Sequence, residues 1–320
     1  MRERYLPLVA TITVFVLVYA VGALSFRYFL STHVLGDLLT DNAFIIIAAI
    51  GSTFVILSGG IDLSIGSMIG FVGIVMARLD TLGWHPLASG AMMIAFGVGF
   101  GALQGLIIDF CEIQPFIVTL AGLFLLRGSC FMVSLDSIPI KNPFVDLFSD
   151  WHFDIGDGGR LSSSAVVMLA VLAAGIVIAH FTRFGANVYA IGGDPTSARL
   201  MGVPIRRTTV MIYGLAGFYS ALGGVVYALY TGSGYPLAGL GDELIAIAAV
   251  VLGGTLLTGG VGLVLGTLFG GLIQGLITTI VNFQGTLTSW WATIFVGVLL
   301  FVFIVAQRTI MGSSIGRRAV

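Results

Sequence analysis

Three polar side chains interrupt stretches that are otherwise apolar, and they are the first candidates for chemistry: Asp62, Gln104 and Gln274. An amide inside an apolar helix costs free energy unless it is hydrogen-bonded. The two glutamines therefore either bond between helices, at about 1 kcal/mol each, or line a path for a polyhydroxy substrate. Asp62 opens an apolar run, so we expect it to cap that helix at a boundary that water reaches. A proton relay is the alternative role for this acid.

Side chains near the ends of later apolar runs offer further contacts for such a substrate. We predict Tyr230, Asn282 and Phe283 as additional residues of the substrate path, because aromatic faces and amides suit a sugar. The same residues could instead anchor or cap helix ends, which is a common role for single aromatic and amide side chains there.

Catalytic chemistry finds no support in the sequence. None of the four histidines neighbours another His or a Cys, and no nucleophile elbow or paired-acid site is visible. The chain also has no G-x-x-x-x-G-K-[ST] string to hold nucleotide phosphates. We therefore predict that it is not an enzyme, and that it binds no metal and no cofactor. ATP and Mg²⁺ would be held by a separate ATPase.

Composition places these residues in a membrane. Of 320 residues, 58% are hydrophobic and 9% are charged, against roughly a quarter charged in an ordinary soluble domain. We therefore expect an integral membrane protein in contact with lipid. The net charge of −1 does not provide the basic surface that binding to nucleic acid requires.

Apolar runs of spanning or near-spanning length recur along the whole chain, judged against the roughly 20 residues that a bilayer requires. They predict an all-α integral membrane protein with about ten transmembrane helices in a single domain, 1–320. Two runs, 43–58 and 243–257, are short, and one of them could be re-entrant or broken at clustered glycines. The ten runs are residues 5–24, 43–58, 63–79, 87–108, 116–134, 163–181, 209–231, 243–257, 260–281 and 289–306.

Two matches between the halves predict an internal repeat. G-A-L-Q-G-L-I at 101–107 matches G-L-I-Q-G-L-I at 271–277, and G-G-I-D ending at Asp62 is similar to G-L-G-D ending at Asp242. Because each half would hold five spans, an odd number, the second copy must enter the membrane in the opposite direction. The sequence thus predicts a 5+5 inverted repeat, as many transporters have.

Positive charge predicts the orientation. With the N-terminus inside, the inner side holds more Lys and Arg than the outer side, as the positive-inside rule requires. We therefore expect both termini in the cytoplasm. The inner set is Arg2, Arg4, Arg183, Arg199, Arg206, Arg207, Arg308, Arg317 and Arg318, and the outer set is Arg27, Arg78, Arg127, Lys141 and Arg160.

The segment 182–207 is long, polar and basic, and holds four of the fourteen Lys and Arg residues. Within it, residues 192–195, G-G-D-P, predict a turn followed by a helix start, because glycine permits φ > 0, Asp caps and Pro suits the first helical turn. We expect a short surface helix at 196–201, closed by Gly202. Such a loop is where a protein outside the membrane could bind.

Motifs in this segment and elsewhere resemble the ABC-importer permeases of the ribose-type sugar family. The resemblance rests on T-R-F-G at 182–185, A-I-G-G-D-P at 190–195 and A-x-x-M-G-V at 198–203. It extends over nearly the whole chain through residues 57–67, 114–128 and 241–267. Within the family, residues 40–64 and S-I-P-I at 137–140 look closest to the permeases of galactofuranose importers.

The resemblance implies a transmembrane permease subunit of an ATP-driven monosaccharide importer in the bacterial inner membrane. The sugar would be galactofuranose, with ribose or another pentose or hexose as the alternative. A second permease, identical or different, would complete the pore. The segment 182–207 would be the cytoplasmic coupling loop that docks onto the ATPase subunit, through Gly192, Gly193, Asp194, Pro195, Ala198, Arg199, Met201 and Gly202.

The segment 134–162 is the longest stretch expected outside the cytoplasm, and it is acidic. It is either a solvated loop or a docking rim for a periplasmic sugar-binding protein. Its acids are Asp136, Asp146, Asp150, Asp154 and Asp157.

A secondary transporter driven by protons or sodium is the alternative from another class. Such transporters place ionisable residues inside their spans. Acids within the predicted spans are scarce here, and the helix-bearing basic loop also favours an importer that couples to an ATPase.

Overall fold

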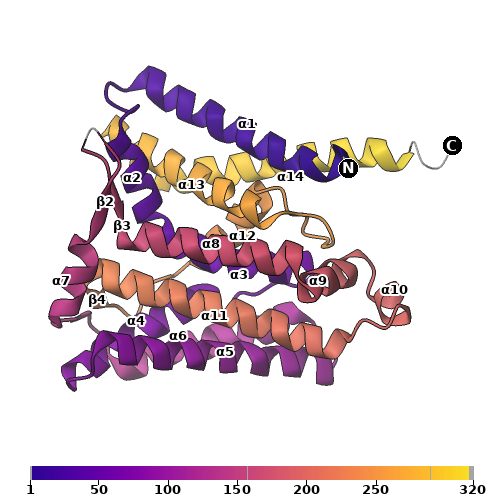
Figure 1. The fold of residues 1–320 in the computed structure, drawn as a ribbon, viewed down its shortest axis with the longest axis horizontal. Helices are drawn as coiled ribbons and strands as arrows, with labels where there is room; N and C mark the ends of the chain where they lie inside the picture. Colours follow the sequence, from indigo (N-terminus) through magenta and orange to yellow (C-terminus); the bar gives the residue numbers. More distant parts are fainter. Residues whose placement is uncertain (1, 157, 289, 317–320) are drawn as a thin grey trace.

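The computed structural model describes residues 2–156, 158–288 and 290–316, and these form a bundle of helices that lie along one long direction (Figure 1). In chain order the helices are α1 (Arg2–Ser25), α2 (Thr32–Asp41), α3 (Ala43–Leu57), α4 (Ile65–Thr81), α5 (Pro86–Phe110), α6 (Pro115–Val133), α7 (Pro143–Asp150), α8 (Ser163–Phe181), α9 (Arg183–Gly193), α10 (Pro195–Leu200), α11 (Ile205–Thr231), α12 (Asp242–Leu252), α13 (Val264–Gln284) and α14 (Trp290–Gly316). Two small antiparallel pairs join β1 (Ile138–Pro139) to β4 (Ser233–Gly234) and β2 (His152–Asp154) to β3 (Arg160–Ser162).

Six helices among the described residues are long and apolar enough to cross a bilayer. They are Pro7–Ser25 of α1 together with α5, α6, α8, α11 and α13. The pair α2 and α3 adds a seventh candidate if it counts as one span, although the two helices meet at 55°. The expected count of about ten spans is therefore not confirmed.

The difference arises because some of the helices on these runs are shorter than a full span. Helix α4 has 17 residues, as many as the predicted run 63–79, whereas α12 has only 11 and ends before the run 243–257 does. Residues 58–64 separate α3 from α4, and residues 253–263 separate α12 from α13. Gly59, Gly254 and Gly260 adopt φ of +83°, +89° and +75° in these breaks, a region open mainly to glycine. Of the two short runs, 243–257 is thus the one that breaks, at the end of α12.

Helix α11 packs against α3, α4 and α5. Its contact with α5 depends on small residues. A Cβ at Gly217 would lie 2.0 Å from the carbonyl oxygen of Gly97, and one at Gly101 would lie 2.1 Å from that of Tyr213. Glycine at these positions lets the two backbones touch, the usual means of tight helix packing in lipid.

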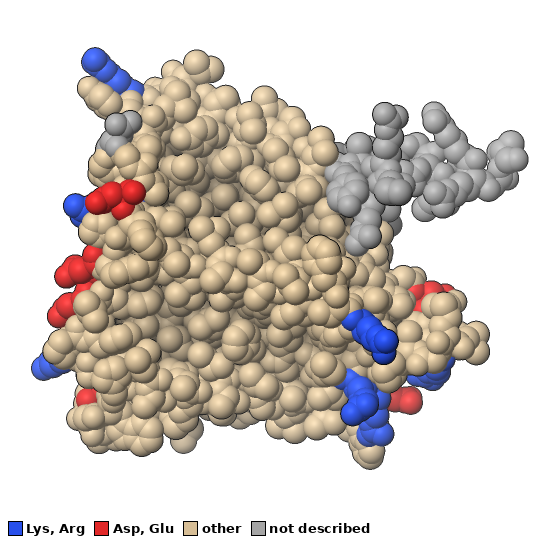
Figure 2. Space-filling model, in the orientation of Figure 1, with Lys and Arg blue, Asp and Glu red and all other residues tan. Residues whose placement is uncertain are grey.

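Charged side chains gather at two opposite ends of the molecule and leave a wide uncharged surface between them in this view (Figure 2). We call one the α10 end, which carries α9 and α10, and the other the α7 end, which carries α2, α7 and the β2–β3 pair (Figure 1). The band between them suits contact with lipid tails. Which end faces the cytoplasm stays a prediction. Five arginines of the expected inner set fall outside the side chains that the structure describes: Arg2, Arg4, Arg308, Arg317 and Arg318.

Candidate functional site

The basic segment 182–207 forms two consecutive helices at one end of the bundle. Helix α9 starts after Thr182, whose Oγ1 accepts a hydrogen bond from the Gly185 amide at 3.2 Å. Asp194 then separates α9 from α10, and its Oδ1 accepts from the Ser197 amide at 2.9 Å. Pro195 occupies the first turn of α10 and Gly202, with φ +82°, follows its end. The short capped helix is confirmed.

Two details of that expectation need correction. Gly192 and Gly193 are the last residues of α9 and not a turn before α10. Ala198, expected as a docking contact, has no exposed surface because α10 turns that side toward the protein, where the Val203 amide bonds to its carbonyl oxygen at 3.0 Å. The exposed apolar side chains are Leu200, at 85%, and Met201, at 71%. Leu200 was missed, although the apolar pair before a closing glycine could have indicated it.

Exposed arginines surround this apolar pair. Arg199 on α10 and Arg207 at the start of α11 are exposed, as is Arg206. Arg206 Nε lies 3.3 Å from Asp109 Oδ2, and its guanidinium lies over the Phe110 ring at 5.1 Å. The α10 end therefore presents two exposed apolar side chains, Leu200 and Met201, which we call the apolar knob, together with exposed arginines. This combination suits an acidic cleft on another protein.

The end of α9 touches both breaks in the bundle. A Cβ at Gly192 would lie 1.8 Å from the carbonyl oxygen of Leu57, at the end of α3, and 2.5 Å from the amide nitrogen of Gly260. The Gly260 amide donates to the same Leu57 oxygen at 2.8 Å. Tyr189 Oη donates to the carbonyl oxygen of Gly262 at 2.7 Å. Helix α9 is thus in direct contact with the end of α3 and with the break before α13.

Asp62 lies inside the protein and not at a boundary that water reaches. It is 4% exposed, and its Oδ1 accepts from the amide and the hydroxyl of Ser64 at 2.8 and 2.7 Å. Helix α4 begins at Ile65, so Asp62 closes the turn that leads into the helix and does not cap its first turn. The expected position was wrong because residues 58–64 run back into the protein after α3.

The two buried glutamines make parallel contacts in the two halves. Gln104, 4% exposed, places Oε1 3.4 Å from the Ser64 hydroxyl, just before α4. Gln274, 6% exposed, donates from Nε2 to the Ile245 carbonyl oxygen in the first turn of α12 at 3.1 Å. Each glutamine thus reaches the start of a short helix. This likeness agrees with an inverted repeat, which itself stays a prediction.

The five residues expected along a substrate path do not meet at one place. Gln274 lines a cavity of about 250 Å³ beside α13, and Tyr230 Oη donates to Asp41, another lining residue, at 2.7 Å. Gln104 lies beside Ser64 instead. Phe283 packs against the rings of Phe26 and Phe29, with centroids 5.6 and 5.4 Å away. Asn282 is exposed near the end of α13.

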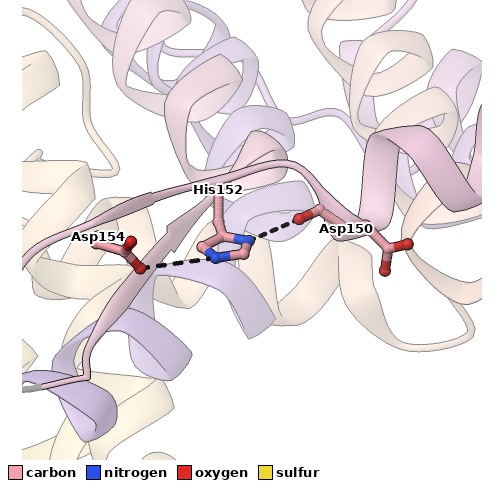
Figure 3. Close-up of polar contacts among 3 residues, drawn as sticks. All are labelled: Asp150, His152 and Asp154. Carbon is pink, nitrogen blue, oxygen red and sulfur yellow. Dashed lines mark hydrogen bonds and ion pairs between the residues drawn. The ribbon is translucent and has the colours of Figure 1, made fainter.

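The acidic segment 134–162 is folded and not an open loop, since it contains β1, α7, β2 and β3. Figure 3 shows His152 between two neighbours, with Nδ1 2.6 Å from the backbone oxygen of Asp150 and Nε2 3.6 Å from Asp154 Oδ1. The carboxylate of Asp150 points away from this ring (Figure 3). Asp157 lies outside the described residues. The α7 end thus carries an ordered acidic surface.

Arg127 on α6, which the sequence placed among the outer charges, is partly buried and anchors another segment. Its guanidinium donates from one nitrogen to the carbonyl oxygens of Pro236 and Ala238 at 2.8 and 2.7 Å. These belong to the segment between β4 and α12. A basic residue within an apolar run was the available signal, because such a group needs partners.

Comparison with known proteins gives consistent matches. Residues 34–304 match the model of the family described as "branched-chain amino acid transport system / permease component". The chain is 54% identical to the inner membrane ABC transporter permease protein YjfF of Escherichia coli K12, over 96% of this chain and 93% of that protein. It is 36% identical to the fructose import permease protein FruG of Bifidobacterium longum, over 97% and 92% of the two chains. It is 35% identical to the ribose import permease protein RbsC of Escherichia coli K12, over 93% and 92%. No solved structure matches.

Proposed function

Because the chain belongs to this family of transport-system permease components, and its relatives include ABC permeases for fructose and ribose, we propose that it forms half of the translocation pore of a galactofuranose importer. Whichever sugar it carries, the chain is a sugar ABC importer permease, a multi-pass inner-membrane protein and not an enzyme. Galactofuranose is supported by the resemblance of residues 40–64 and 137–140 to permeases of such importers. Ribose and other pentoses or hexoses are the alternatives.

The observation that carries the proposal is the α9–α10 segment. It presents Leu200 and Met201 to solvent at one end of the bundle, and its Gly192 packs directly on Leu57 at the end of α3 and on Gly260 in the break before α13. An element that is exposed on one side and packed directly on the bundle on the other suits rigid-body coupling between subunits. We propose that it docks onto an ATPase subunit, which holds ATP and Mg²⁺.

The other partners follow from the same proposal. A second permease, identical or different, completes the pore, and a periplasmic sugar-binding protein delivers the sugar at the α7 end. The α10 end and both termini then lie in the cytoplasm, as the arginines Arg183, Arg199, Arg206 and Arg207 support under the positive-inside rule. The acidic surface around Asp150 and Asp154 is the rim proposed for the binding protein.

Charge placed on the exposed knob tests the docking proposal. We expect Leu200→Glu and Met201→Glu to prevent co-purification of the ATPase subunit, because a few central apolar contacts carry most of an interface energy. Leu82→Glu is the matched control, since Leu82 is 65% exposed at the opposite end of the bundle. The docking assignment is wrong if both knob variants retain the ATPase and ATP hydrolysis that responds to sugar.

A further inference from the structure

A cavity of about 250 Å³ lies where the bend between α2 and α3 meets the starts of α12 and α14 and the second half of α13. Six of its lining residues have polar side chains, and three of these, Asp41, Thr278 and Thr293, are exposed at its open side. Phe44 adds an aromatic ring, which is held edge-on by Tyr227 at 4.8 Å. The polar lining comes from four elements: Asp41, Asn42, Asp242, Gln274, Thr278 and Thr293.

Gly275 on α13 leaves room for the side chain of Asn42 beside this cavity. A Cβ at Gly275, the residue after Gln274 on α13, would lie 2.3 Å from Nδ2 and 2.8 Å from Oδ1 of Asn42. Asn42 sits at the 55° bend between α2 and α3. Glycine on α13 therefore lets the amide of Asn42 stay at the edge of the cavity.

Three side chains in this wall are each fixed through one atom. Gln274 donates from Nε2 to Ile245, Asn42 donates from Nδ2 to Leu38 at 2.8 Å, and Asp41 Oδ1 accepts from Tyr230. Within the described part of the chain, the amide oxygens of Gln274 and Asn42 and Oδ2 of Asp41 have no hydrogen bond to the protein. Each is an acceptor with its orientation already set, which lowers the entropy lost on binding.

We infer that this cavity is a contact site for the transported sugar within a single permease chain. A neutral polyhydroxy molecule fits its chemistry, because its hydroxyls can donate to the fixed oxygens and to Thr278 Oγ1, and can accept from the hydroxyl of Thr293. The ring of Phe44 supplies an apolar face. The carboxylates of Asp41 and Asp242 disfavour an anionic ligand.

Size and composition narrow the ligand further. The cavity volume of about 250 Å³ leaves room for a small ligand such as one sugar ring. Across the residues that the structure describes, no group of three or more His, Cys, Asp or Glu side chains could hold a metal ion. A single neutral monosaccharide is the ligand that these properties favour. This inference rests on the proposed function, because it requires a sugar to pass through the chain.

Two adjacent threonines provide a matched pair of variants. Thr278 Oγ1 donates to the Gln274 carbonyl oxygen at 3.1 Å, and Thr279 Oγ1 donates to that of Gly275 at 2.9 Å. Valine removes the same kind of bond at both positions and keeps the shape of the side chain. Only Thr278 lines the cavity, so a difference between the two variants reports on the cavity.

The measurement is the amount of labelled galactofuranose moved per ATP hydrolysed by the complete complex in proteoliposomes, with saturating sugar-loaded binding protein. We expect Thr278→Val to lower this ratio about threefold to tenfold and Gln274→Leu about tenfold, as the loss of one hydrogen bond to the ligand implies. Thr279→Val should keep the wild-type ratio. Stimulation of ATP hydrolysis by the binding protein should persist in all three.

The outcomes separate this inference from the proposed function. If Thr278→Val and Gln274→Leu both keep the wild-type ratio, the cavity does not contact the sugar. An equal loss in Thr279→Val would also overturn the inference, because the effect would then come from α13 as a whole. If the unaltered complex moves neither galactofuranose nor ribose, the proposed function itself fails. Should Gln274→Leu fail to insert, the threonine pair still decides.

Discussion

At the scale of single residues, polar side chains within this bundle bond to backbone atoms of the segments that lead into α4 and α12, or of the first turn of α12. Arg127 bonds to two carbonyl oxygens of the segment before α12, Asp62 bonds to Ser64 before α4, and Gln274 bonds to Ile245 within α12. In lipid, an irregular segment needs such partners, because water is not there to satisfy its carbonyl and amide groups. These side chains therefore make the breaks possible.

Removing the guanidinium should weaken the fold. We expect Arg127→Met to lower the free energy of unfolding by about 2 to 4 kcal/mol, because two hydrogen bonds from a charged group are lost and two carbonyl oxygens remain unpaired. Thermal unfolding of the purified permease in detergent measures this as a lower midpoint. Arg78→Met is the control, since Arg78 is exposed at the end of α4 and should leave the midpoint unchanged. A midpoint for Arg127→Met equal to that of the control would rule out the anchoring role.

Sequence reasoning found the buried polar residues but not their surroundings. An amide or acid within an apolar run is visible in the sequence, and so Asp62, Gln104 and Gln274 could be singled out. Their hydrogen-bond partners depend on the path that residues 58–64 and 235–241 take back into the protein. The pattern of neighbouring residues does not predict that path. The burial of Asp62 and the packing of Phe283 against two rings followed only from the tertiary fold.

At the scale of elements, the position of α9 against the two breaks is the feature with the largest mechanistic consequence. Gly192 has ordinary helical geometry within α9, so its glycine is required by contact and not by backbone conformation. The carbonyl oxygen of Leu57 and the amide of Gly260 occupy the space that a side chain would need. One small residue thus keeps α9 in contact with both α3 and the turn before α13.

A methyl group at position 192 should push α9 away from α3 and from the turn before α13. We expect Gly192→Ala to force a shift that costs about 1 to 3 kcal/mol, and so to lower sugar transport per ATP hydrolysed while the ATPase still co-purifies. Gly99→Ala is the matched control, because a Cβ at Gly99 in α5 would meet no atom within 4 Å. Normal transport per ATP in Gly192→Ala would show that this contact transmits nothing.

Helix boundaries were predictable where the signal was local. Asp194, Pro195 and Gly202 identified the short helix α10 because capping and φ > 0 are properties of single residues. Helix α9 was not predicted, since its residues read as a polar glycine-containing turn until Thr182 and the contacts with α3 are known. The length of α12 was overestimated because apolar sequence continues through the break after Leu252.

At the scale of the whole molecule, the two ends differ in a way that suits transport in one direction. The α10 end presents Leu200, Met201 and exposed arginines, whereas the α7 end presents the ordered acidic segment around α7 (Figure 2). The composition and apolar runs predicted the membrane protein, and the motifs predicted its family, which the match over residues 34–304 confirms. The number of spans could not be read from the runs alone.

The most direct test of the account is labelled galactofuranose uptake by proteoliposomes that hold this permease, its partner permease, the ATPase subunit and the sugar-binding protein. We predict that the labelled sugar accumulates against its own concentration gradient and that this accumulation requires ATP and Mg²⁺ on the side of the ATPase subunit. The accumulation should continue when ionophores collapse the proton and sodium gradients. Vesicles with this chain alone should accumulate nothing. Uptake by the chain alone, or uptake that stops with the ion gradient while ATP remains, would contradict an ATP-driven permease and favour a secondary transporter.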